Sequence, residues 1–229
     1  MLLDCDLIIF DCDGVLVDTE PMTTRLIAES VSAMGWEVDQ AFAIETFKGK
    51  DMAEIVAMVG EHLGRPVPEL TEHYRAKMYA ELEGGGADPM PGAVDLLDAL
   101  DAIEGGPKRC VASNGPRRKM QASLISSGIA GRFGGMESPT IFSAYDIEKW
   151  KPDPALFLHA CAQMGSTPDR CIVFEDSESG IEAASRAGMR SVGVGGLTPS
   201  AKLAAKGATV TIERMDELLP LAGVTGTRH

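Results

Sequence analysis

Two aspartates at the end of an apolar run are the residues best suited to do chemistry. The run of residues 7–10 is followed by Asp11, Cys12, Asp13 and Gly14. Four consecutive apolar residues predict a strand buried on both faces, and strand alternation would place Asp11 and Asp13 on one side with Cys12 facing away. Two carboxylates that converge there repel each other unless a cation or a shared proton relieves them. The stretch therefore indicates a reactive site more than the simple turn that Asp-Gly often forms.

Calcium binding is one alternative interpretation of this Asp-x-Asp-Gly sequence. An EF-hand loop needs oxygen ligands at its fifth, seventh and ninth positions and a glutamate at its twelfth. Counted from Asp11, those positions hold Val15, Val17, Thr19 and Met22. The segment is too apolar to bind calcium in that way.

Composition limits the class of protein. The 229 residues are 45% hydrophobic and 24% charged, which is ordinary for a globular protein. A net charge of −13 argues against a nucleic-acid partner but allows a small phosphorylated metabolite as substrate. Five scattered cysteines indicate free thiols in a reducing compartment, and no signal peptide or membrane span is evident. We expect a cytoplasmic monomer without a membrane partner.

Hydrophobic periodicity divides the chain into a helical part and an alternating part. Residues 20–34, 52–63 and 69–82 follow a helical pattern without a convincing strand, and glycines and prolines interrupt the chain at 84–92. Beyond that point strands alternate with helices. The expected strands are 109–112, 140–143, 171–174, 191–194 and 209–211, and the expected helices are 94–103, 117–127, 155–164 and 181–187.

This alternation predicts an α/β fold with a parallel sheet and helices on both faces. The first strand must join that sheet, so we expect a core domain at 1–18 and 90–229. Residues 19–89 then form an inserted helical cap domain. Hinges near 18–20 and 86–92 would let the cap close over a substrate and open to release product.

Polar residues follow three apolar runs, where the strands of a parallel sheet end and ligands bind. A fourth contributor, Lys151, lies in the loop 150–154 before an expected helix. Each has an ordinary explanation when taken alone, as a helix cap or a solvated loop charge. Their agreement on one sheet edge favours a functional site. They are Asp11, Asp13, Ser113, Lys151, Glu175 and Asp176.

Phosphoryl transfer through a carboxylate needs this set of groups. Asp11 would attack phosphorus and form an aspartyl-phosphate, while Asp13 would act as general acid and then as general base. Magnesium suits a site of carboxylate and carbonyl oxygens, here those of Asp11, Asp13, Asp176 and Glu175. Lys151 and the Ser113 hydroxyl would contact the remaining phosphoryl oxygens. The catalytic set is therefore Asp11, Asp13, Lys151 and Ser113.

Four segments in chain order resemble the motifs of the haloacid dehalogenase-like (HAD) hydrolases. They are Asp11–Asp18, Val111–Asn114, Lys151–Pro154 and Val173–Ser177. The resemblance spans essentially the whole chain. It implies a Rossmann-like core, a small helical cap of the C1 type and dependence on Mg²⁺.

Particular positions favour one branch of this family. Members that dehalogenate acids lack an acid at the position of Asp13, so the resemblance implies phosphate chemistry. The sugar phosphomutases similar to this chain carry a cap histidine where this sequence has Thr23, and an arginine where it has Met52. Both departures favour a phosphatase, and a β-phosphoglucomutase-like mutase remains the alternative.

Segments around the motifs are similar to bacterial phosphatases that act on 6-phosphogluconate. The matching segments are 47–49, 113–116, 119–121 and 143–156. We therefore expect a sugar phosphate or sugar-acid phosphate as substrate, with 6-phosphogluconate as the leading candidate. Ser113, Asn114, Lys151, Lys48 and Arg117 are the expected substrate-binding residues, the last two for a second anionic group.

A receiver-like module, which accepts phosphate without turnover, is the non-enzymatic alternative. Such a module also gathers acids, a hydroxyl and a lysine around magnesium. Asp13 and the helical insertion distinguish the enzyme, because a receiver needs neither of them.

Overall fold

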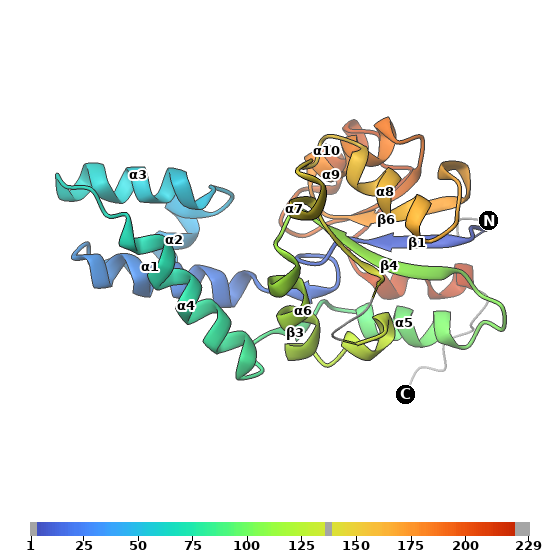
Figure 1. The fold of residues 1–229 in the computed structure, drawn as a ribbon, viewed down its shortest axis with the longest axis horizontal. Coiled ribbons are helices and arrows are strands. Elements are labelled where there is room, and N and C mark those ends of the chain that lie inside the picture. Colours follow the sequence, from blue (N-terminus) through green and yellow to red (C-terminus); the bar gives the residue numbers. More distant parts are fainter. Residues whose placement is uncertain (1–3, 136–138, 223–229) are drawn as a thin grey trace. The chain divides into compact units, whose positions relative to one another are not determined.

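The structure is a computed structural model that describes residues 4–135 and 139–222 (Figure 1). The chain forms two compact units. The first comprises the described residues up to Asp18 and from Asp88 onward, and the second is Thr19–Ala87. Within the described residues, no helix combines the length and apolar character needed to cross a bilayer.

A six-stranded parallel sheet is the centre of the first unit, and its order is β5-β4-β1-β6-β7-β8. This arrangement confirms the predicted α/β fold. The central strand β1 lies between β4 and β6, so its carboxyl end is flanked by the ends of both (Figure 1). The strands are β1 (Leu7–Phe10), β4 (Lys108–Ser113), β5 (Ile141–Ser143), β6 (Cys171–Glu175), β7 (Arg190–Val194) and β8 (Val210–Ile212).

Helices cover both faces of this sheet, with α8 and α9 on one side and α5 on the other (Figure 1). Leu7 and Ile9 pack with apolar residues of α8 and α9. Phe10 points to the opposite face and contacts the rings of Phe133 and Phe174. The helices of this unit are α5 (Ala93–Asp101), α6 (Arg117–Ser126), α7 (Ala144–Ile147), α8 (Ala155–Gln163), α9 (Glu178–Arg186) and α10 (Ser200–Ala205).

The second unit is helical and has a core of its own. Val31, Phe47, Ile55, Val59 and Leu70 are among the residues buried in it. Its helices are α1 (Glu20–Met34), α2 (Gln40–Phe47), α3 (Met52–Leu63) and α4 (Glu69–Glu83).

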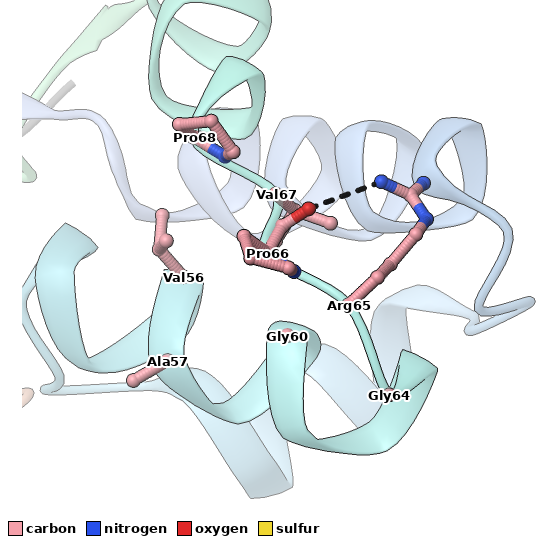
Figure 2. Close-up of a pocket in the computed structure, with 8 residues that line it drawn as sticks. All are labelled: Val56, Ala57, Gly60, Gly64, Arg65, Pro66, Val67 and Pro68. Carbon is pink, nitrogen blue, oxygen red and sulfur yellow. Dashed lines mark hydrogen bonds between the residues drawn. The ribbon is translucent and has the colours of Figure 1, made fainter.

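An open, mostly apolar groove lies between α3 and the segment that leads to α4 (Figure 2). Val56 and Gly60 line it on α3, and Pro66 lines it on the connecting segment. An Arg65 guanidinium N–H donates to the Pro66 carbonyl at 3.2 Å beside the groove.

Some elements and boundaries differ from the sequence-based expectation. The helices α2, α7 and α10 were not predicted, because α7 and α10 are short and α2 lacks a clear apolar stripe. The two-residue strands β2 (Val17–Asp18) and β3 (Asp88–Pro89) pair with each other, which places residues 88 and 89 in the first unit. The roles of the two units as core and cap remain a prediction.

Candidate active site

The turn after β1 positions Asp11 and Asp13. β1 ends at Phe10, so Asp11 and Asp13 lie just beyond the strand whose alternation the sequence analysis used to place them on one side. Backbone hydrogen bonds hold the turn that carries them. The Asp11 N–H donates to the Phe174 carbonyl at 2.9 Å, and the Gly14 N–H donates to the Val17 carbonyl at 2.9 Å. Gly14 has a φ of +75°, which a residue with a side chain adopts only with strain.

Lys151 joins the turn after β1 to the end of β6. Its Nζ donates to Asp11 Oδ1 at 2.5 Å and to Glu175 Oε2 at 2.7 Å, and its side chain is only 3% exposed. Asn114 fixes the backbone of Lys151 from the loop after β4. The Lys151 N–H donates to Asn114 Oδ1 at 2.9 Å, and Asn114 Nδ2 donates to the Lys151 carbonyl at 3.4 Å.

Glu175 is held on both of its carboxylate oxygens. Oε2 accepts from Lys151, while Oε1 accepts from the Ser177 N–H at 3.1 Å and from Ser177 Oγ at 2.7 Å. Ser177 also caps α9, because its Oγ accepts from the Gly180 N–H at 3.0 Å. A Cβ on Gly180 would lie 2.0 Å from Glu175 Cδ, so only glycine fits beside this buried acid.

Three carboxyl groups converge where β1 and β6 end. Asp11, Glu175 and Asp176 each offer an oxygen, and these oxygens lie within 4.8 Å of one another. Burial, partly offset by Lys151, raises the pKa of Asp11 to about 7. Burial and the charges of Glu175 and Asp11 raise the pKa of Asp176 to about 9.

The one ammonium group in this cluster does not balance its acids. Although burial alone would lower the pKa of Lys151, the carboxylates of Asp11 and Glu175 outweigh it and raise that pKa above its usual value. When all three acids are ionised, the cluster therefore keeps a net negative charge in a buried place. An oxygen-only donor set with excess negative charge fits a hard divalent cation such as Mg²⁺.

Asp13 has a partner that the sequence analysis did not assign. Lys119, in the first turns of α6, donates its Nζ to Asp13 Oδ2 at 2.5 Å. The sequence does indicate that Lys119 lies near the carboxyl end of β4, because only a short loop and the first turn of α6 separate it from Ser113. No periodicity argument chooses it over its neighbours Arg117 and Arg118, however.

Ser113 lies buried at the end of β4 and belongs to the same sheet edge. Its Oγ accepts from the Gly115 N–H at 3.4 Å, and the Gly115 carbonyl accepts from Ser143 Oγ at 2.7 Å. These contacts join the loop after β4 to the end of β5.

The two predicted cations for a second anionic group are each paired with an acid. Arg117 contacts Asp146 at 2.6 Å in the first unit. Lys48 contacts Glu20 at 2.5 Å within the second unit. The roles of both residues in substrate binding remain predictions.

Comparisons with known proteins identify a family for this chain. The model of the haloacid dehalogenase-like hydrolases matches residues 5–188. The 6-phosphogluconate phosphatase of Escherichia coli (strain K12) is 36% identical over 184 residues, which cover 80% of this chain and 79% of that protein.

Solved structures show the same fold. A conserved haloacid dehalogenase-like protein of unknown function from Agrobacterium tumefaciens is 31% identical, with a TM-score of 0.76 over 96% of this chain and 98% of that one. A putative β-phosphoglucomutase from Thermotoga maritima has a TM-score of 0.79 over 95% and 98% of the two chains. Its identity is 23%, so this second likeness concerns the fold alone.

Proposed function

The chain belongs to the haloacid dehalogenase-like hydrolase family, and from that premise we propose that it is a magnesium-dependent phosphatase for a small sugar-acid phosphate. Membership confirms the resemblance that the four sequence motifs predicted. The observation that best supports the proposed chemistry is the meeting of Asp11, Lys151, Glu175 and Asp176, which come from three distant segments of the chain.

The proposed reaction has two displacements at phosphorus. In the first, an Asp11 carboxylate oxygen attacks phosphorus, the bond to the leaving oxygen breaks, and that oxygen takes a proton from Asp13. In the second, water attacks the aspartyl-phosphate and gives a proton to Asp13, and the bond from phosphorus to Asp11 breaks. The products are an alcohol and inorganic phosphate, and both aspartates return to their starting states.

In this proposal, Lys151 and the Ser113 hydroxyl contact the phosphoryl oxygens. The ammonium of Lys151 attracts the phosphoryl oxygens, and its contact with Asp11 also favours the ionised form of that nucleophile. Glu175 holds Lys151 in place, because Glu175 Oε2 accepts a hydrogen bond from Lys151 Nζ. Asn114 holds the backbone of the same lysine, so its role here is to orient Lys151.

Magnesium would be held by carboxylate oxygens of Asp11 and Asp176 and by the Asp13 carbonyl. Both oxygens of Glu175 already have protein partners, which favours an indirect role for that residue. A bound Mg²⁺ would neutralise charge as nucleophile and phosphate approach each other.

The substrate is the finer part of the proposal. The E. coli relative, described as a 6-phosphogluconate phosphatase, supports 6-phosphogluconate as the substrate here. That molecule has a phosphate at one end and a carboxylate at the other. Arg117 is one cation that could receive the carboxylate, in competition with Asp146.

A substrate panel tests the proposal. EDTA-treated protein would be assayed for inorganic phosphate release from 6-phosphogluconate, glucose 6-phosphate, fructose 1-phosphate and p-nitrophenyl phosphate, with and without Mg²⁺. Asp11→Asn is the inactive variant, and Asp169→Asn is its matched control, because Asp169 is an exposed acid of the same unit.

We expect Mg²⁺-dependent release with the highest kcat/KM for 6-phosphogluconate, and none from Asp11→Asn. A single equivalent of bound phosphate without turnover would favour the receiver-like alternative instead. Conversion of β-glucose 1-phosphate to glucose 6-phosphate without phosphate release would favour the mutase.

A further inference from the structure

The ion pair between Lys119 and Asp13 joins two segments that are far apart in the sequence. The two residues are 106 positions apart, and their charged atoms lie 2.5 Å from each other. Lys119 comes from α6, while Asp13 lies in the turn after β1. The pair therefore ties the proposed acid–base group to a different segment from the one that supplies it.

Lys119 is in a sheltered position for a lysine. Its side chain is 19% exposed and that of Asp13 is 31% exposed, so solvent screens the pair less than a fully exposed one. A Cβ on Gly115 would lie 4.0 Å from Lys119 Cδ and 3.8 Å from Ser113 Oγ. The aliphatic stem of Lys119 thus runs along the same side of the loop as the Ser113 hydroxyl.

We propose that Lys119 is a positioning residue for Asp13, holding its carboxyl group where it can exchange a proton with the leaving oxygen and with water. This inference rests on the proposed function, in which Asp13 is the general acid and base. A charge-assisted hydrogen bond is short and directional, so it restricts the rotation of the short aspartate side chain. General acid–base catalysis depends on that restriction, because the group must lie within hydrogen-bond reach of the oxygen.

A different role for Lys119 would be to bind the substrate directly. Substrates with different leaving groups distinguish the two roles. A sugar alkoxide leaves poorly without a proton, whereas p-nitrophenolate leaves well without one, and kcat/KM reports the steps up to departure of the leaving group. A positioning residue for the acid therefore matters more for the sugar phosphate, while a lysine that binds phosphate matters equally for both.

The test compares Lys119→Met, Lys119→Arg and the control Lys202→Met, with 6-phosphogluconate and p-nitrophenyl phosphate in Mg²⁺. Lys202 is an exposed lysine of the same unit that pairs with Glu178 at 3.8 Å. Lys202→Met removes the same charge away from the catalytic edge. Circular dichroism melting would verify that each variant is folded.

We expect Lys119→Met to lower kcat/KM for 6-phosphogluconate by about 10- to 100-fold, with a clearly smaller loss for p-nitrophenyl phosphate. Lys119→Arg should recover part of the difference, and Lys202→Met should change neither value. In an Asp13→Asn background, Lys119→Met should have no further effect, because Lys119 acts through Asp13.

Equal losses for the two substrates, a rise in KM alone or undiminished activity of folded Lys119→Met would overturn the positioning role and leave the phosphatase intact. A wild-type protein that hydrolyses neither substrate would overturn the proposed function, and the positioning role with it.

Discussion

A Cβ placed on Gly14 would lie 2.2 Å from Asp176 Oδ2, so the turn after β1 is in close contact with the acid that follows β6. Gly14 also has a φ of +75°. The glycine is therefore required for two reasons, a backbone conformation and an approach that no side chain permits. This contact explains why the motif needs glycine directly after its second aspartate.

Gly14→Ala should impair both stability and the proposed metal site. A left-handed conformation costs an alanine about 1–2 kcal/mol, and the methyl group would also displace the Asp176 carboxylate. The matched control is Gly128→Ala, because Gly128 has a φ of +74° with no atom within 4 Å of its Cβ position.

Urea unfolding and a Mg²⁺ titration of activity provide the measurement. Gly14→Ala should be the less stable of the two alanine variants and should need more Mg²⁺ for half-maximal activity. Equal behaviour of the two variants would show that the contact with Asp176 has no consequence.

Lys151→Met should lower kcat/KM by about 10²- to 10³-fold, which is typical for loss of one electrostatic group at a reacting centre. Lys151 lowers the pKa of Asp11 against the effect of burial, so its removal should raise that pKa above about 7. Since Asp11 attacks in its ionised form, the acid limb of the pH–kcat/KM profile should move to higher pH.

Lys149→Met is the control, because Lys149 is a neighbouring lysine with a 60% exposed side chain. Its pH profile should match that of the wild type. An unshifted acid limb in Lys151→Met would contradict the assignment of Asp11 as the ionising nucleophile.

The metal-free protein should lose stability as the pH rises from about 4 to about 9. The folded-state pKa values of Asp11 and Asp176 are about 7 and about 9, whereas an unfolded aspartate titrates near pH 3.9. A folded-state pKa above the unfolded value means that the folded state holds the proton more tightly. The resulting stability is fully present below about pH 4 and is lost as pH rises through each folded-state pKa.

Melting temperatures in EDTA and in Mg²⁺ at pH 5.5 and pH 8 measure this effect. The EDTA sample should melt at a lower temperature at pH 8, and Mg²⁺ should raise the melting temperature more at pH 8, where its ligands are ionised. Asp176→Asn should reduce both differences. A melting temperature in EDTA that is independent of pH would contradict the charge imbalance described for the cluster.

Arg117→Ala should affect substrates differently, depending on whether they carry a carboxylate at the end opposite the phosphate. If Arg117 binds the carboxylate of 6-phosphogluconate, its loss should raise KM for that substrate by about 5- to 10-fold. The KM for glucose 6-phosphate, which lacks the carboxylate, should stay near the wild-type value. Arg214→Ala removes a comparable exposed arginine–aspartate pair and serves as control. A similar change in KM for both substrates would remove Arg117 from substrate selection.

The sequence was sufficient to predict the parallel sheet and the polar residues that gather at the carboxyl ends of its strands. Short apolar runs such as 7–10 and 171–174, in a chain that alternates strands and helices, are typical of neighbouring strands buried in a parallel sheet, and β1 and β6 do pair in this way. The rule that ligands bind where such strands end placed Asp11, Glu175 and Asp176 together. Lys151, which was expected to join them from a loop before a helix, contacts Asp11 although 140 positions separate the two residues.

Side-chain pairing within the site was beyond sequence reasoning. Asp11 and Asp13 lie in a turn beyond the end of β1, and a backbone hydrogen bond from Asp11 to Phe174 of β6 helps to hold that turn. The partnership of Lys119 with Asp13 depends on which way two side chains rotate, and composition does not determine that. Likewise, the double contact of Glu175 with Lys151 and Ser177 follows from the close approach that Gly180 permits.

Covalent trapping of the phosphoenzyme tests the central claim most directly. Asp13→Asn should form the aspartyl-phosphate from p-nitrophenyl phosphate, which needs no proton on its leaving group, and then hydrolyse it slowly. Acid quenching, borohydride reduction and peptide mass spectrometry would locate the modified residue. The account predicts one equivalent of p-nitrophenol per protein and homoserine at position 11. Turnover of p-nitrophenyl phosphate by the wild type, with Asp11 unmodified in the quenched Asp13→Asn sample, would contradict it.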